Sequence, residues 1–263
     1  MELVTRVIGP LQTNVHLVGD PRTREAIAID AAIPGLPWIT GQLEARGWRL
    51  ALIVSTHGHW DHAGENAALQ AWSREAAGAA GAPSPGSAGA RGEDHGPARD
   101  DPSAAPALAV VAADGRAHHP DPSDGAEIAA HPADWYRLTD PQPLFAPFPI
   151  PPCVPAAELA EGAAIRFGDV RLDVLHTPGH TEGSVCLVER ASGILFSGDT
   201  LFAGGWGRVD LPGGDPDAMA ASLARLATLH DDLRVLPGHG SATTIARERP
   251  WLEMVARERR LPL

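Results

Sequence analysis

The sequence has 263 residues and contains no lysine, so all 21 of its basic residues are arginine. This absence excludes enzymes that form a Schiff base through lysine and nucleotide-binding proteins whose P-loop needs one. Cysteine is scarce as well: Cys153 and Cys186 are the two cysteines, and they are too few and too far apart to indicate a disulfide framework. Cys186 lies in the strand-like segment SVCLVE, where we expect a small buried hydrophobic residue.

Long hydrophobic runs are absent too. No apolar stretch reaches the roughly 18 residues of a membrane span, and the start, MELVTRVIGP, lacks the basic and apolar regions of a secretory signal. The formal net charge of -12 argues against nucleic acid or an anionic membrane as the main partner. We therefore expect a cytoplasmic protein that binds neither nucleic acid nor a membrane, and the sequence leaves the number of subunits open. Its 44% of hydrophobic residues suffices for a sizeable core.

The first part of the chain alternates short strands and helices. Patterning predicts a meander of three strands, then a helix, a strand and a second helix, at residues 3–9, 14–19, 26–30, 36–47, 49–56 and 63–77. Residues 78–106 are rich in Ala, Gly, Ser and Pro, a composition that buries too little apolar surface to offset its ordering entropy. We interpret them as a disordered insertion.

The second part repeats this alternation. A strand at 107–113 is followed by a Pro- and His-bearing stretch, 118–155, which we interpret as an irregular loop region. Four strands in an antiparallel layer, a helix, a strand and an amphipathic terminal helix follow, at residues 163–168, 170–177, 183–190, 193–199, 217–230, 233–238 and 242–260.

The segment STHGHWDHAG places His57, His59, Asp61 and His62 within six residues, directly after an apolar strand. Three further loops after apolar strands each carry one potential ligand: His180 in LHTPGHT, Asp199 in LFSGDTLF and His239 in VLPGHG. Strand ends give rigid support, and Gly and Pro let the backbone turn sharply. We therefore expect these seven side chains to converge at one rim of the sheets.

Imidazole and carboxylate ligands suit zinc, with iron and manganese as alternatives, and the shortage of cysteine argues against a structural zinc site. Seven nitrogen and oxygen ligands are too many for one tetrahedral ion. They suit two ions that share a bridging ligand and leave positions for solvent, as in catalytic dinuclear centres.

The motifs THGHWDH, PGHT, SGDTLFAGGWGR and LPGHG resemble those of the metallo-β-lactamase fold superfamily, specifically its compact glyoxalase II-like hydrolases. The resemblance implies one α/β domain over residues 1–263, a four-layer αββα sandwich of two mixed sheets flanked by helices, interrupted by the insertion at 78–106. It also implies a role for each motif residue. His57, His59 and His180 would hold one metal ion, Asp61, His62 and His239 the second, and Asp199 would bridge both, while Asp30 would orient the histidine loop.

The activity implied by the resemblance is hydrolysis of small S-acyl or S-2-hydroxyacyl thioesters by a hydroxide shared between the two divalent ions, with Asp61 orienting it and accepting its proton. Arg208 in GGWGRVD either contacts the substrate or forms a surface ion pair. Trp60 and Trp206 are candidates for groove walls or for the core.

Several alternatives to thioester hydrolysis stay open, and a nuclease is the weakest enzyme among them because the net charge is acidic. On the same fold, a persulfide dioxygenase would bind one iron through a subset of these ligands, and a lactonase or β-lactamase is a further possibility. A non-catalytic binding module would be expected to have lost ligands, and none of the seven is missing.

Overall fold

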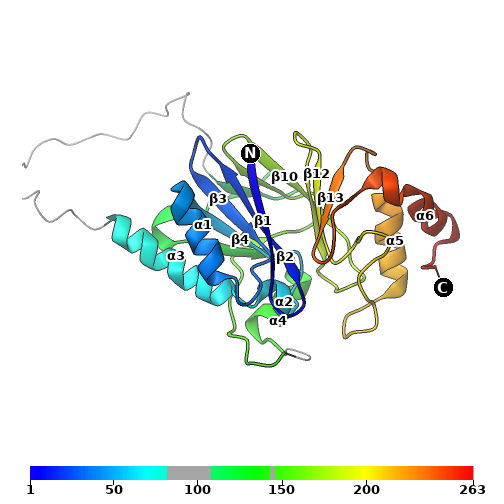
Figure 1. Cartoon of the computed structure of the whole chain (residues 1–263), viewed down its shortest axis with the longest axis horizontal. Coiled ribbons are helices and arrows are strands. Elements are labelled where there is room, and N and C mark those ends of the chain that lie inside the picture. The colour runs from blue at the N-terminus through cyan, green and yellow to red at the C-terminus, as the bar shows by residue number, and fades with distance from the viewer. Residues whose placement is uncertain (82–107, 143–145, 263) are drawn as a thin grey trace, which may run out of the picture.

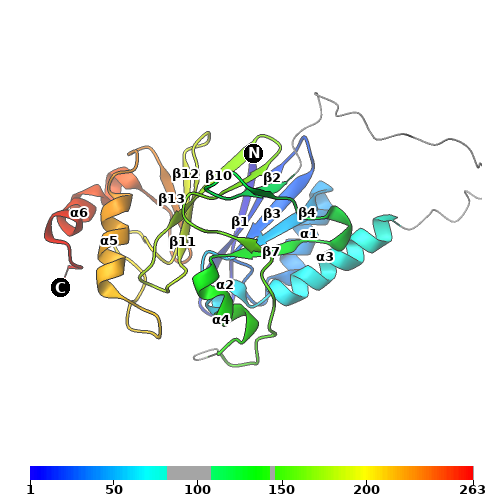
Figure 2. The same cartoon turned by 180° about the vertical axis from the view of Figure 1, so that it is seen from behind.

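The computed structural model describes residues 1–81, 108–142 and 146–262, and it contains two β-sheets packed between helices (Figures 1 and 2). The first sheet has six strands in the spatial order β1 (Glu2–Ile8), β2 (Thr13–Asp20), β3 (Glu25–Ile29), β4 (Arg49–Val54), β7 (Glu127–Ala130) and β8 (Ala157–Glu158). Strands β1 to β3 form the predicted antiparallel meander, whereas β3, β4, β7 and β8 pair in parallel. The first sheet is therefore mixed.

The second sheet has eight strands. Their spatial order is β14 (Thr243–Thr244), β13 (Arg234–Pro237), β12 (Ile194–Gly198), β11 (Val185–Glu189), β10 (Val170–His176), β9 (Ala164–Phe167), β5 (Ala109–Val111) and β6 (Ala117–His118). Strands β9 to β12 pair antiparallel, as the sequence predicts, and β12 pairs in parallel with β13. This sheet is mixed as well.

Helices cover the outer face of each sheet. Figure 1 shows α1 (Leu36–Arg46) and α3 (Asn66–Gly81) beside the first sheet, and α5 (Pro216–Leu226) and α6 (Ile245–Glu258) beside the second. Three buried apolar clusters fill the three interfaces between these four layers. Ile27 and Phe167 belong to the cluster between the sheets, Leu43 to the one under α1, and Leu223 to the one under α5. The predicted αββα architecture is confirmed.

Burial on both faces explains why the central strands are almost continuously apolar. In β3, Ile27 and Ile29 face the cluster between the sheets, while Ala26 and Ala28 face the cluster under α1. Successive side chains of a strand point to opposite faces, so a strand covered on both sides needs apolar residues at every position. Residues 26–29 of this strand, AIAI, meet that requirement.

The prediction of an irregular region at 118–155 is wrong for two segments. Strand β7 pairs in parallel with β4 as the fifth of the six strands in the first sheet, and α4 (Trp135–Thr139) follows soon after it. The strand is the four residues EIAA, too short to show an alternating pattern.

Helix α3 also extends to Gly81, four residues into the segment predicted to be disordered, and residues 82–106 of that segment lie outside the described residues. Within the described ranges, no helix has the length and apolar character to span a membrane.

Candidate metal centre

The seven predicted ligands lie at the carboxyl ends of four strands. His57 and His59 follow β4, Asp61 and His62 belong to the short helix α2 (Trp60–Ala63), and His180, Asp199 and His239 follow β10, β12 and β13. Both sheets contribute, so the group forms where their edges meet. We call these seven residues the His/Asp cluster.

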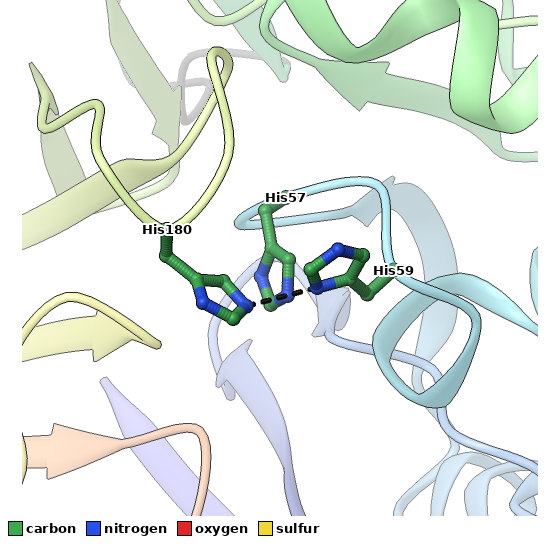
Figure 3. A group of neighbouring side chains, drawn as sticks. All are labelled: His57, His59 and His180. Atoms are coloured by element: carbon green, nitrogen blue, oxygen red, sulfur yellow. Dashed lines mark hydrogen bonds between the residues drawn. The ribbon is translucent and has the colours of Figure 1, made fainter. Parts of the chain in front are cut away.

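The first triad consists of His57, His59 and His180. Their ligand atoms all lie within 4.8 Å of one another, and His59 Nδ1 lies 2.9 Å from His180 Nε2. Figure 3 shows the three rings converging from the loop after β4 and the loop after β10. His57 Nε2 is buried and has no hydrogen-bond partner among the described residues. A buried polar atom without a partner is costly, so this nitrogen is suited to a metal ion.

The second triad consists of Asp61, His62 and His239, whose ligand atoms also lie within 4.8 Å of one another. His62 Nε2 lies 3.1 Å from His239 Nε2, and Asp61 Oδ2 lies 3.2 Å from the same His239 nitrogen. The second triad therefore differs from the first in containing a carboxylate.

Asp199 lies between the two triads. Its Oδ2 is 3.5 Å from His180 Nε2 of the first triad and 3.5 Å from His239 Nε2 of the second. Its Oδ1 is 3.4 Å from His62 Nε2 and is another buried atom without a hydrogen-bond partner among the described residues. A Cβ at Gly238 would lie 2.2 Å from this oxygen, so the loop of His239 approaches Asp199 only because this position is glycine.

Hydrogen bonds to the opposite ring nitrogen orient three of the histidines. His180 Nδ1 donates to the backbone oxygen of Arg208 (2.8 Å), and His239 Nδ1 donates to the backbone oxygen of Leu11 (2.9 Å). His62 Nδ1 lies 3.0 Å from Asp30 Oδ2. Each contact occupies Nδ1 and leaves Nε2 directed into the cluster, the arrangement found in metal-binding histidines.

Asp30 is buried beneath the second triad. Besides His62, its carboxylate accepts hydrogen bonds from the Thr56 backbone nitrogen (2.8 Å) and the Thr56 hydroxyl (2.9 Å). Its backbone has φ of 59°, a left-handed conformation that costs free energy in a non-glycine residue. The structure thus places Asp30 where it orients both the histidine loop and His62.

Asp134 is a residue that the sequence analysis missed. Its fully buried carboxylate accepts hydrogen bonds from the Gly58 nitrogen (2.7 Å), the Thr181 hydroxyl (2.7 Å) and the Gly183 nitrogen (2.9 Å). Gly58 separates His57 from His59, and Thr181 follows His180. Asp134 therefore ties together the two loops that supply the first triad. No pattern in the sequence indicates this role, because Asp134 lies in the stretch 118–155 that was interpreted as an irregular loop region.

The pKa values differ sharply between the triads. Burial, reinforced by neighbouring imidazoles, lowers the pKa of His57 well below its usual value and that of His59 to about 3. Burial also opposes charge on the second triad, but the carboxylates of Asp199 and Asp61 outweigh it. They raise the pKa of His62 to about 9 and that of His239 to about 11. The carboxylates around the second triad therefore favour a positive charge there, carried either by protons or by a metal ion.

The residues present fit a divalent metal. The donor atoms are imidazole nitrogens and carboxylate oxygens, the set that suits zinc, iron and manganese. Both cysteines are buried, and neither belongs to any of the clustered ligand groups among the described residues. Five buried side-chain atoms of the described residues have no hydrogen-bond partner, and two of them, His57 Nε2 and Asp199 Oδ1, belong to the His/Asp cluster.

A cavity of about 770 Å³ opens onto the cluster, a volume typical of small-molecule sites. Five cluster residues line it, together with Trp60, a predicted wall, and Arg208, whose side chain forms a bidentate ion pair with Asp210 at 2.7 and 2.8 Å. Trp206 instead packs against Trp251 beside α6, with ring centroids 5.8 Å apart. Arg208 is thus half of a surface ion pair and also faces the cavity, so its position agrees with both predicted roles, the ion pair and the substrate contact.

The sequence profile of the metallo-beta-lactamase superfamily matches residues 8–239. A hydroxyacylglutathione hydrolase of Maricaulis maris is 30% identical over 247 residues, 94% of this chain and 70% of that protein. An uncharacterized protein of Aquifex aeolicus is 31% identical over 93% of this chain and 92% of its own.

Two solved structures show the same architecture over nearly the whole chain. The BLEG-1 B3 metallo-beta-lactamase aligns with a TM-score of 0.69 and 25% identity, covering 95% of this chain and 99% of its own. TTHA1623 in a di-iron-bound form aligns with a TM-score of 0.65 and 29% identity, covering 93% and 96%. With its sequence, fold and His/Asp cluster in agreement, this chain belongs to the metallo-beta-lactamase superfamily.

Proposed function

We propose that the protein is a dinuclear metal-dependent hydrolase that cleaves small acyl thioesters, of which 2-hydroxyacyl thioesters are one class. The observation that carries this proposal is the pair of triads on either side of Asp199, opening onto one cavity. Two ions, zinc in our proposal, would occupy the first triad and the second triad, with the Asp199 carboxylate between them. The hydroxyacylglutathione hydrolase of Maricaulis maris and the di-iron form of TTHA1623 support this combination.

Divalent ions bound there would lower the pKa of a water molecule and polarise the scissile carbonyl. The remaining work falls to side chains of the protein. Asp61 lines the cavity, and although burial opposes its charge, His62 and the hydrogen bond from His239 keep its pKa below the usual value. It is therefore ionised near neutral pH and is placed to orient the nucleophilic water and accept its proton.

A thioester suits this cavity because the leaving thiolate needs little protonation. A free thiol has a pKa of about 8.5, far below that of an alcohol or amine leaving group. Asp61 is the acid–base group in this mechanism, and no separate strong acid is required. An ordinary ester or amide would demand one.

The completeness of the second triad favours the hydrolase over a persulfide dioxygenase with one iron. A single ion in the first triad would leave Asp61, His62 and His239 without a shared cation, although their ligand atoms lie within 4.8 Å of one another.

The test combines metal analysis with thioester hydrolysis. We expect two zinc ions per chain and release of free thiol from S-lactoylglutathione or S-acetyl-N-acetylcysteamine, abolished by a chelator and restored by zinc. One iron per chain, with oxygen uptake in the presence of glutathione persulfide and no thioester hydrolysis, would replace this proposal with the dioxygenase.

A further inference from the structure

The cavity wall beyond the His/Asp cluster is mostly apolar. It includes Leu11, Trp60, Tyr136, Ile150, Phe202 and Leu211. A thioester bound with its carbonyl at the cluster must place the rest of its thiol carrier against this wall. Apolar surface of this kind gains from contact with uncharged groups and penalises the burial of charged ones.

The charged side chains of this wall, apart from the cluster, are Arg137, Arg208 and Asp140 among the described residues. Neither arginine offers an unpaired charge. Arg137 Nη2 lies 2.6 Å from Glu182 Oε2 and donates to the Pro212 backbone oxygen at 2.8 Å. With 10% of its side chain exposed, Arg137 is held in this arrangement.

Arg208 donates two of its five guanidinium N–H groups to Asp210. Nε and Nη2 donate to the two oxygens of that carboxylate in a bidentate pair, at 2.7 and 2.8 Å. The pair is exposed and weak enough to open, but the Asp210 carboxylate stays beside any anion that displaces it. An incoming carboxylate therefore meets a guanidinium and a like charge together.

With these partners included, the charged groups beside the wall are two guanidiniums and three carboxylates. Glutathione carries two carboxylates and one ammonium at neutral pH, so its carboxylates find no unpaired cation on this wall. A neutral carrier has no charge that needs a partner, and its contact with the apolar surface favours binding.

From this balance we infer that the enzyme selects thioesters whose thiol carrier is uncharged, in preference to thioesters of anionic glutathione. This inference rests on the proposed thioester hydrolysis. It assigns a specificity role to the Arg208–Asp210 pair, in which the acid cancels the positive charge that an anionic carrier would need.

The experiment compares two substrates with the same acyl group, S-acetyl-N-acetylcysteamine and S-acetylglutathione, on the zinc-loaded protein. We expect kcat/KM to be at least about tenfold higher for the neutral carrier. In Asp210→Asn the guanidinium of Arg208 loses its acidic partner, so the preference should shrink several-fold through a faster reaction of the glutathione thioester.

Asp231→Asn is the matched control, because Asp231 pairs with Arg249 at 2.5 Å, and neither of these residues lines the cavity. This variant should leave the substrate preference unchanged. An equal or higher kcat/KM for the glutathione thioester in the unmodified protein, or a preference unmoved by Asp210→Asn, overturns the inference while thioester hydrolysis stands. Failure to cleave either substrate with two zinc ions bound overturns the proposed function and the inference with it.

Discussion

The first triad and the second triad use the same imidazole chemistry in opposite electrostatic surroundings. Burial and neighbouring imidazoles keep His57 and His59 neutral. His62 and His239 face Asp61 and Asp199, which hold them protonated near neutral pH in the absence of metal. The comparison shows that a cation at the second triad must displace protons, whereas His57 and His59 of the first triad are already deprotonated and ready to bind a metal ion.

The largest expected effect comes from removing Asp199, which lies between the first triad and the second triad. Asp199→Ala deletes the carboxylate that lies 3.5 Å from a histidine of each triad. Because even supporting residues around a metal cost 10–100-fold when mutated, we expect thioester hydrolysis to fall more than about 100-fold. Metal analysis should show fewer than two ions per chain. Full activity with two ions retained would contradict the shared role of Asp199.

Two supporting carboxylates allow the triads to be weakened separately. Asp134 accepts hydrogen bonds from the loops of the first triad, and Asp30 contacts His62 of the second. We expect Asp134→Ala to weaken metal binding about 10–100-fold at the first triad alone, and Asp30→Ala to do so at the second. Titration with cobalt(II), followed by its visible absorption, distinguishes the two ligand sets.

Thr181→Val provides the matched control, since it removes one of the three donors to Asp134 and leaves the carboxylate in place. Its effect on the first triad should be smaller than that of Asp134→Ala. Equal losses at both triads from either aspartate variant would indicate general unfolding and refute a selective positioning role.

The charge difference also predicts how the stability of the metal-free protein depends on pH. His57 and His59 have lowered pKa values, so their contribution is complete above the unfolded value of about 6.5 and is lost as pH falls through the lowered values, about 3 for His59. His62 and His239 have raised pKa values, so theirs is complete below about 6.5 and is lost as pH rises through about 9 and about 11.

Thermal unfolding in the presence of a chelator should therefore show greatest stability near pH 6.5 and a decline on the alkaline side. Saturating zinc should remove the alkaline decline, because the metal replaces those protons. A metal-free protein whose melting temperature keeps rising from pH 6.5 to 9 would contradict the assignment of charge to the second triad.

The smallest effect is expected for a histidine outside both triads. His176 precedes His180 by four residues, but its ring stacks on His131 at 3.9 Å and its Nε2 bonds the Glu182 backbone oxygen. His176→Ala should cost about 1 kcal/mol of unfolding free energy, the value of one partly exposed hydrogen bond. Its metal content should equal that of the unmodified protein, and loss of an ion would place His176 among the ligands.

The candidate site shows which features a sequence reveals and which it hides. His57, His59, Asp61 and His62 are readable because local spacing alone brings them to one strand end. Most of the strands and helices around them follow from hydrophobic patterning, whereas the four-layer architecture was implied by the resemblance of the motifs to a known family. The role of these residues as metal ligands stays a prediction.

Other features depend on contacts that no local pattern encodes. Asp134 binds groups 47 to 76 positions away in the chain, and the orientation of His180 depends on a backbone oxygen that any residue at position 208 would supply. Strand β7 was missed because its four residues, EIAA, are too few to show an alternation of apolar and polar side chains.

The central claim is that the first triad and the second triad each hold one metal ion around a shared Asp199. A crystal grown with zinc and measured on both sides of the zinc absorption edge tests it directly. The account predicts two anomalous peaks, each about 2.0–2.2 Å from the nitrogen and oxygen ligands of its own triad. A single peak, or none between these imidazoles, would contradict it.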